Sequence, residues 1–253
     1  FQFLFLSYQI LFFHQNLKRF LLVVFSLRNY KLQNIKNKEV IMSITVIIPT
    51  LKMDEELFRL LYVMPKDVII VNGGSETHNF NDKFFIINTN PGRGLQLKSG
   101  ATFATGDWLL FLHVDSKMTT KWWDTLQKHM KNEPEKALAF RLKFDDQGFF
   151  PRLLEHWVRF RCWAFALPYG DQGLFISRKL YDEIGGYNDM PLMEDVDIIK
   201  RIGKKRLTMS DQVIITSAEK YNKYGYLFRM IRNGFCLLLY KLGVDPAIIK
   251  KIY

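Results

Sequence analysis

His113 and Asp115 directly follow an apolar run in the stretch LLFLHVDS, residues 109–116. Such an unbroken run is typical of a strand in a parallel sheet, which is buried on both faces. Ligands of open α/β sheets bind just beyond the carboxyl ends of these strands. A carboxylate there could hold Mg²⁺ or Mn²⁺ against a diphosphate, because these ions leave coordination positions for phosphate and water. The simpler interpretation is that Asp115 caps a turn.

Glu194 and Asp195 form a second candidate pair, in PLMEDVDII, residues 191–199. The helix dipole alone would favour acids at a helix start. The apolar residues before them would disfavour the charged form of a carboxylate, which is the usual tuning of a general base. Upstream, PYGDQGLF places Asp171 and Gln172 between two glycines. That stretch is either a plain turn or a polar ledge for a substrate.

Two glycine-containing loops could approach a ligand. NGGS, residues 72–75, holds a glycine pair that permits tight turning and close approach of a ligand. NPGRGLQ, residues 90–96, opens a helix whose backbone amides could meet a phosphate together with Arg93. It is not a dinucleotide fingerprint, because Leu97 stands where the third glycine would be, and it is not a Walker A loop. Taken alone, NGGS is more simply a turn. NPGRGLQ alone is more simply a loop and helix start in which Arg93 is solvated.

The elements that would position these residues alternate between strands and helices. We predict strands at 44–49, 67–72, 84–89 and 107–113, with helices at 53–64 and 93–104. This alternation indicates βαβ units and a parallel sheet, so the polar strand ends would meet at one edge, where a nucleotide would lie. Beyond about residue 136 we predict strands at 137–144 and 212–221 and helices at 150–167, 193–205 and 226–244.

Composition favours an ordinary globular domain. Of the 253 residues, 48% are hydrophobic and 24% are charged, which is common for globular chains. The net charge of +11 calls for an anionic partner: nucleic acid, an acidic membrane surface or phosphorylated small molecules. The charges are scattered rather than gathered in a basic aromatic stripe, so we expect no nucleic acid. Cys162 and Cys236 form no metal-ligand cluster or disulfide framework, and a reducing cytoplasm is favoured.

Residues 1–41 differ from the remainder in composition, being crowded with Phe, Leu, Asn and Lys. Polar residues interrupt their apolar runs before the roughly 18 residues that a membrane span requires, and no small-residue cleavage site follows. We expect the natural protein to start at Met42 and the leader to be spurious or disordered, with a basic membrane-surface anchor as the competing interpretation. Residues 42–253 would form one domain, with a nucleotide-binding half at 42–118 and an acceptor half at 119–253.

The order of several stretches resembles glycosyltransferase family 2 over residues 43–253. These stretches are TVIIPTLKMDEE, NGGS, GRGLQLKSGATFATGDWLLFLHVD, LPYGDQGLFISR and GGYNDMPLMEDVD. The resemblance is strongest to the bacterial radical-SAM/selenodomain-associated transferases. It implies a GT-A fold, an α/β fold with a mostly parallel central sheet flanked by helices. It also implies a hexosyltransferase that takes a nucleotide-diphosphate sugar donor, uses Mg²⁺ or Mn²⁺ and inverts the anomeric centre.

The resemblance also implies roles for single residues. Asp195 matches the catalytic base and Glu194 its neighbour, and Asp115 stands at the metal-ligand position of the family's D-x-D motif. Asp171 and Gln172 would face the acceptor. The nucleotide-binding positions would be Thr50, Glu55, Asn72, Gly73, Arg93, Gln96 and His113. Asn72 departs from the family's usual aspartate, and the Q-x-x-R-W signature of processive synthases is missing, so we expect a single addition.

Two other functions remain open at this level. A sugar-1-phosphate nucleotidyltransferase would carry a glycine-rich basic loop after its first strand, whereas PTLKMDEE is acidic and lacks glycine. A non-catalytic protein that binds nucleotides or anionic surfaces would also suit the net charge. The apolar helix at 226–244 suggests a cytoplasmic protein peripheral to the inner membrane face, with Arg229, Arg232 and Lys241 reaching headgroups. Packing of this helix in a core is the competing interpretation.

Overall fold

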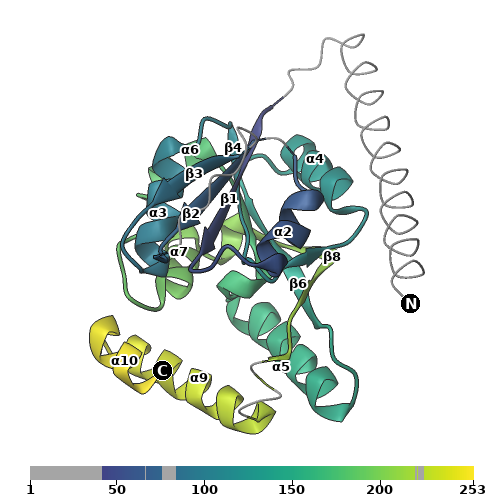
Figure 1. Ribbon diagram of the computed structural model, residues 1–253. Coiled ribbons are helices and arrows are strands. Elements are labelled where there is room, and N and C mark those ends of the chain that lie inside the picture. The colour runs from purple at the N-terminus through teal and green to yellow at the C-terminus, as the bar shows by residue number, and fades with distance from the viewer. Residues whose placement is uncertain (1–41, 66, 76–83, 220, 222–224) are drawn as a thin grey trace, which may run out of the picture. The chain divides into compact units, whose positions relative to one another are not determined.

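Eight strands form one mixed sheet in the order β3-β2-β1-β4-β7-β6-β8-β5 (Figure 1). The computed structural model describes residues 42–253 except 66, 76–83, 220 and 222–224, so our expectations for residues 1–41 lie outside the described residues. β1 to β4 run parallel, β7 runs antiparallel to β4 and β6, β8 is parallel to β6, and β5 is antiparallel to β8. The strands are β1 Ile44–Thr50, β2 Val68–Asn72, β3 Phe85–Asn88, β4 Trp108–Phe111, β5 Lys117–Met118, β6 Ala137–Phe144, β7 Leu174–Ser177 and β8 Leu207–Thr216.

Helices cover both faces of the sheet and follow most strands. They are α2 Glu55–Tyr62, α3 Arg93–Phe103, α4 Trp122–Asn132, α5 Phe149–Phe165, α6 Arg178–Glu183, α7 Glu194–Ile202, α9 Tyr226–Lys241 and α10 Pro246–Ile252, with 3₁₀ turns η1 Gly170–Gln172 and η2 Lys204–Arg206. The predicted α/β fold with a helix-flanked central sheet is therefore confirmed.

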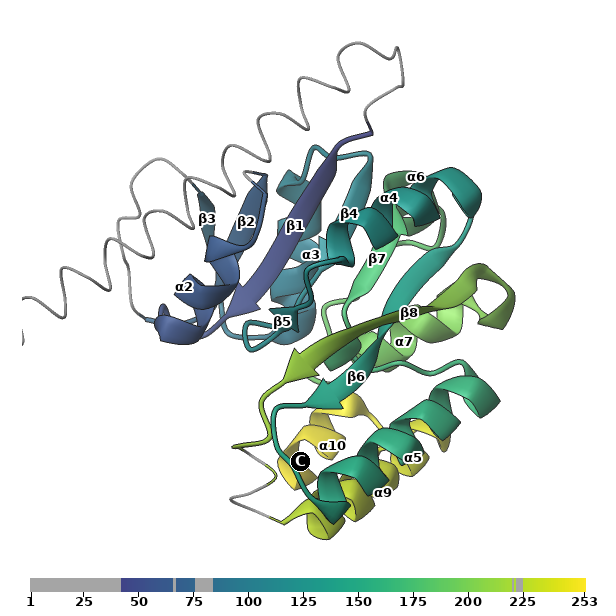
Figure 2. The same ribbon diagram turned by 90° about the vertical axis from the view of Figure 1, so that its right-hand side faces the viewer.

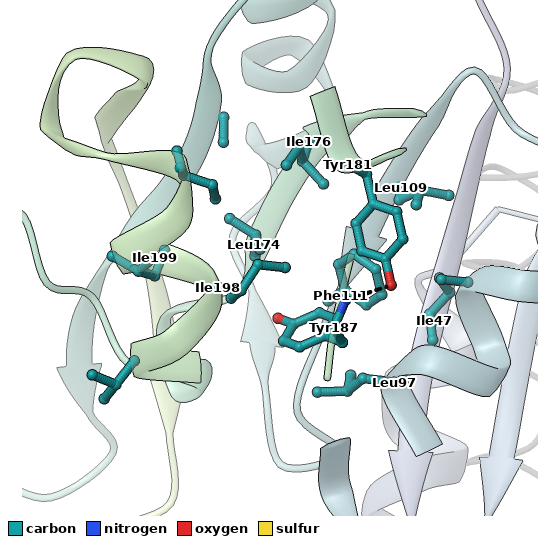
Figure 3. Close-up of a cluster of buried hydrophobic side chains, with 14 of the residues drawn as sticks. Ile47, Leu97, Leu109, Phe111, Leu174, Ile176, Tyr181, Tyr187, Ile198 and Ile199 are labelled. Atoms are coloured by element: carbon teal, nitrogen blue, oxygen red, sulfur yellow. Dashed lines mark hydrogen bonds between the residues drawn. The ribbon is translucent and has the colours of Figure 1, made fainter. Parts of the chain in front are cut away.

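β1 is buried at all seven positions because the core lies on both of its faces. Ile47 belongs to the cluster under α3, α6 and α7, in which Leu97, Phe111 and Tyr187 also lie (Figure 3). Val46 belongs to the opposite cluster, under α2 and α4. Two-sided burial explains why this strand reads as a continuous apolar run rather than an alternating one.

The second half of the sheet departs from the predicted pattern. β7, at Leu174–Ser177, and the helix α4 were not predicted, and β7 introduces the antiparallel pairs beside β4. The last strand was predicted at 212–221 but lies at Leu207–Thr216. The first residues of this strand are half-buried and partly polar, so the hydrophobic pattern alone missed them.

α5 and α9 lie side by side below β6 and β8 in both views (Figures 1 and 2). The inner face of α5 packs Leu154, Val158 and Cys162 against Leu142 and Phe144 of β6. Cys162 and Cys236 are both buried free thiols, as expected for cysteines that serve core packing. Within the described part of the chain, no helix is both long and apolar enough to span a bilayer.

Candidate functional site

The polar ends of three neighbouring strands meet at one edge of the sheet. Thr50 ends β1 and is the register partner of Asn72, which ends β2. β4 pairs with the other side of β1 and ends at Phe111, so that His113 and Asp115 follow at the same edge. The expected convergence of these strand ends is confirmed.

A cavity of about 530 Å³ opens at this edge. Its volume falls in the usual range for sites that hold small molecules. Its walls come from the loop after β1, the start of α3, the loop after β4 and the C-terminal helix α10. The lining residues are Pro49, Thr50, Leu51, Lys52, Asp54, Pro91, Gly92, Arg93, Gln96, His113, Val114, Pro191 and Lys250.

Lys52, Asp54 and Lys250 are cavity residues that the sequence did not single out. Lys250 lies on α10, between 59 and 201 residues along the chain from the other lining residues, and no motif surrounds it. Asp54 is the N-cap of α2, and its carboxylate accepts from the backbone N–H of Leu57 at 3.3 Å. Its neighbour Glu55, which we had expected at the nucleoside, is an exposed residue paired with Arg59 at 2.7 Å.

Gln96 ties the cavity walls together. Its buried amide nitrogen donates to the backbone carbonyl of Thr50 at 2.7 Å and to that of Val71 at 2.8 Å. A Cβ added at Gly73 would lie 3.0 Å from this amide, so the glycine leaves room for it. The side chain of Gln96 thereby fixes the ends of β1 and β2 against α3.

Asn72 holds the loop that follows β2. Its side-chain oxygen accepts from the backbone N–H of Gly74 at 2.9 Å, and its side-chain nitrogen donates to the Asn88 oxygen at 3.0 Å. An aspartate at this position would have no N–H to offer Asn88. Asn72, where the resemblance led us to expect an aspartate, is thus hydrogen-bonded to the neighbouring strand β3.

The imidazole Nδ1 of His113 contacts the carboxylate of Asp115, and both side chains are mostly buried. Burial and, next, the negative charge of Asp115 raise the pKa of Glu56 on α2. Among the described residues, no group of three His, Cys, Asp or Glu side chains could hold a metal ion. Asp115 is nevertheless the donor type that suits Mg²⁺ or Mn²⁺, which commonly take one or two carboxylates and complete their shell with phosphates and water.

Arg93 connects the cavity to the carboxylate pair at the start of α7. Its Nε lies 3.2 Å from Oε1 of the buried Glu194. The backbone N–H of Gly170 donates to Oδ2 of Asp195 at 2.8 Å. A Cβ at Gly170 would lie 2.5 Å from Nη2 of Arg93, so any side chain there would require the guanidinium to shift. Arg93, Gly170, Glu194 and Asp195 therefore form one contact network.

Burial is the main influence on Glu194. Burial and, next, the negative charge of Asp195 raise the pKa of this carboxyl from 4.5 to about 7, and Arg93 opposes both effects. The preceding residue, Met193, has a left-handed backbone with φ 67°, which is rare for a residue with a side chain. Conformations of this kind cost about 1–3 kcal/mol and cluster at functional sites. The strain lies where the chain turns to bring both carboxylates to the network.

Asp171 and Gln172 differ in their surroundings, although they are adjacent in η1. The buried Gln172 amide donates to the carbonyl of Phe140 at 2.9 Å, and its oxygen accepts from Arg161 at 3.1 Å. Its hydrogen-bonding groups thus bind the protein itself. Oδ1 of Asp171 is buried without a hydrogen-bond partner among the described residues, and burial raises the pKa of this carboxyl.

Comparison with known proteins agrees with this geometry. The model of glycosyl transferase family 2 matches residues 45–188, which is more than half of the chain. No curated protein matches the sequence.

Three solved structures share the fold at low identity. GalNAc-T7 with UDP, GalNAc and Mn²⁺ has a TM-score of 0.55 at 12% identity, with 71% of this chain and 44% of that chain covered. The mannosyltransferase PcManGT from Pyrobaculum calidifontis, in complex with GDP-Man and Mn²⁺, has a TM-score of 0.56 at 18% identity. The match covers 73% of this chain and 59% of that chain. S. aureus TarS, residues 1–349, has a TM-score of 0.53 at 15% identity. The match covers 83% of this chain and 69% of that chain.

This chain thus spans 44% and 59% of the first two structures. Identities of 12–18% show a shared fold and nothing finer. The similar structures therefore establish the fold, and the match to residues 45–188 establishes the family. The chain has the GT-A fold and belongs to glycosyl transferase family 2.

Proposed function

We propose that this chain transfers a sugar from a nucleotide-diphosphate donor to an acceptor hydroxyl, with inversion and in a single addition. The observation that carries the proposal is the position of Arg93, which lines the 530 Å³ cavity and also pairs with Glu194. A diphosphate in that cavity would meet the guanidinium directly beside the carboxylate pair. The family membership of the chain supports the same activity.

The donor would lie along the sheet edge. Thr50, Gly73 and the loop held by Asn72 would contact the nucleoside, with Asp54 in the position that we had expected for Glu55. Arg93 and Lys250 would neutralise the diphosphate, and Gln96 would act by fixing the walls. GalNAc-T7 and PcManGT were solved with UDP and with GDP-Man, which supports a nucleotide-sugar donor here and favours a hexose.

Asp115, with His113 beside it, is the proposed ligand of Mg²⁺ or Mn²⁺. The Mn²⁺ in the two similar structures supports a divalent ion in this fold. When bound there, the ion would stabilise negative charge on the leaving diphosphate. With few protein ligands available, phosphate oxygens and water would complete its coordination.

Asp195 is the proposed general base. Its carboxylate would take the proton of the acceptor hydroxyl while the hydroxyl oxygen forms a bond to the anomeric carbon and the bond from that carbon to the diphosphate breaks. The Gly170 N–H holds one carboxylate oxygen in place, and Glu194 orients Arg93. General-base assistance of this kind contributes about 10²–10⁴ in rate.

Location is a further part of the proposal. We propose a bacterial, cytoplasmic protein that is peripheral to the inner membrane face, of the radical-SAM/selenodomain-associated branch. Support comes from exposed apolar side chains on both α5 and α9, such as Trp163 at 74% and Phe228 at 62% exposure. Cosedimentation of the full chain with anionic vesicles at low salt would test this, and absence of binding would contradict it.

Product analysis separates the activity from its rivals. We expect UDP- or GDP-sugars to release the nucleoside diphosphate in the presence of Mn²⁺ and not after chelation. A sugar-1-phosphate nucleotidyltransferase would instead release pyrophosphate from a nucleoside triphosphate and a sugar 1-phosphate. A protein that only binds nucleotides would turn over neither the nucleotide sugars nor the pair of nucleoside triphosphate and sugar 1-phosphate. Pyrophosphate release, or no turnover with any nucleotide sugar, would overturn the proposal.

A further inference from the structure

A cavity of about 110 Å³ lies between α5 and α9, away from the donor cavity. Its walls are largely apolar, with Leu154, Trp157 and Val158 from α5 and Met230 and Leu237 from α9. These walls would exclude water from the hydrocarbon part of a ligand.

One wall of the cavity adjoins the candidate catalytic residues. Tyr169 lines it and also lines the small space beside Asp195. Gly170, the next residue, donates its N–H to Asp195, and Asp171 lines the cavity itself. A molecule held between the two helices would therefore have its inner end close to the proposed base.

Two residues that line this cavity each carry a buried side-chain oxygen without a hydrogen-bond partner among the described residues. Oδ1 of Asp171 and Oδ1 of Asn233 are both buried, and neither has a hydrogen-bond partner among the described residues. Both residues line the cavity. Because a buried acceptor without a donor is unfavourable, the two oxygens call for a ligand that carries hydroxyl groups.

The outer faces of the two helices are apolar and exposed. Single basic residues such as Arg159 of α5 lie among the apolar ones. An apolar helical face with basic residues beside it is typical of helices that lie at an anionic membrane surface. The exposed apolar residues include Phe150, Phe160 and Trp163 of α5 and Phe228, Ile231 and Phe235 of α9.

We infer that the α5–α9 cavity binds an amphipathic acceptor with a hydroxyl-bearing head and a hydrocarbon tail, drawn from a membrane surface. The head and the first carbons of the tail enter the cavity of about 110 Å³, where the head donates to Asp171 and Asn233, and the rest of the tail lies on the exposed apolar faces of α5 and α9. One hydroxyl then reaches Asp195, loses its proton to that carboxylate and bonds to the anomeric carbon as the diphosphate leaves. The transfer step rests on the proposed function, whereas the binding does not.

The test uses n-alkyl β-glucosides with hexyl, octyl and decyl chains as probes, below the concentrations at which they form micelles. Their binding to the full chain is followed by tryptophan fluorescence, to which Trp157 contributes. Each buried methylene is worth about 0.8 kcal/mol, or about fourfold in affinity. We therefore expect each two-carbon step to tighten binding, by up to about fifteenfold where both carbons are buried. An affinity that does not depend on chain length would overturn the inference.

Gly234→Leu is the matching variant. Gly234 lines the cavity on α9, a Cβ there would meet no atom within 4 Å, and leucine favours a helix more than glycine does. Its side chain should fill the cavity and weaken octyl glucoside binding at least tenfold. Phe103→Leu, at an exposed residue of α3 that belongs to neither the cavity walls nor the faces of α5 and α9, should leave binding unchanged. Equal affinity in wild type and Gly234→Leu would overturn the inference.

Two further measurements separate the alternatives. UDP or GDP binding with Mn²⁺ should be the same in wild type and Gly234→Leu. Glucoside binding without any nucleotide binding would refute the proposed function and leave the cavity assignment standing. Sedimentation velocity should show the free chain as a monomer. A dimer that the probe dissociates would mean that a second copy, not an acceptor, covers these helices, and would overturn the inference.

Discussion

The edge of the sheet and the pair α5–α9 treat their polar groups in opposite ways. At the sheet edge, Gln96 and Asn72 use their amides to hold neighbouring loops in place. Between α5 and α9, the oxygens of Asp171 and Asn233 lack partners among the described residues, and apolar surface is exposed nearby. Amides that are already hydrogen-bonded to the protein preorganise the sheet edge, whereas the open acceptors of Asp171 and Asn233 await a ligand.

The network of Arg93, Gly170, Glu194 and Asp195 lies between the two regions. Arg93 reaches it from the sheet edge, and Gly170 reaches it from the loop that leads to Asp171. If the two regions hold donor and acceptor, changes in this network should have the largest effects, and changes on either side should affect one ligand only.

Asp195→Asn should reduce sugar transfer at least a hundredfold while leaving donor affinity nearly unchanged. The amide keeps the shape of the side chain and one acceptor oxygen but cannot take the proton of the acceptor. Steady-state kinetics and calorimetry with the donor nucleotide would measure both effects.

Glu194→Gln is the matched control and should be milder. Normal turnover in Asp195→Asn together with inactivity in Glu194→Gln would assign the base to Glu194. Activity in both variants would mean that the pair only begins a helix.

Glu194 should also make stability depend on pH. Because its pKa is about 7 in the folded chain and ordinarily 4.5, the folded state holds a proton that the unfolded state has lost between these values. The free energy of unfolding should therefore fall as pH rises through this window, by up to about 3 kcal/mol. Urea unfolding at about pH 5 and pH 8 would measure the fall, which Glu194→Gln should remove. An equal fall in both proteins would assign it to other groups.

Asp115→Ala should weaken Mn²⁺-dependent binding of UDP or GDP by about 10–100-fold. The residue follows β4 rather than forming part of its buried run, so the fold should survive. Calorimetry with Mn²⁺ and after chelation would give the effect. Asp211→Ala, which removes an exposed acid paired with Arg141, is the control and should bind normally. Unchanged affinity in Asp115→Ala would exclude the metal role.

Lys250→Ala should lower donor affinity by about fivefold, or about 1 kcal/mol, as expected for a partly solvated ion pair. Lys250 lines the donor cavity, whereas Lys251 is the next residue on α10 and is not among the lining residues. Lys251→Ala should therefore leave binding unchanged. Equal losses in the two variants would indicate a general effect of charge and remove α10 from the donor site.

The sequence predicted the sheet edge better than the helix pair. Apolar runs ending at Thr50, Asn72 and His113 mark buried parallel strands, whose ends must meet. The ion pair between Arg93 and Glu194 joins residues about a hundred positions apart, and no local sequence pattern predicts it. Lys250 likewise reaches the cavity only through tertiary packing of α10.

The nature of the helix 226–244 could not be decided from periodicity alone. Cys236 of α9 is fully buried, while Leu227 and Phe228 are mostly exposed. Core packing therefore holds for one face of the helix, and membrane contact of the exposed face stays a prediction. Arg229, which we had expected to reach headgroups, is buried. The face that is covered depends on the packing of α5 beside α9, which is a tertiary contact that periodicity does not predict.

Thermal unfolding of the full chain with a panel of nucleotide sugars tests the central claim most directly. A nucleotide sugar that binds the folded chain at a hundredfold excess over its Kd should raise the free energy of unfolding by about 2.7 kcal/mol. We predict this stabilisation for sugars of one nucleotide, in the presence of Mn²⁺, and its loss on chelation. Absence of stabilisation by every UDP-, GDP-, ADP-, CDP- and dTDP-sugar in the panel would contradict the account.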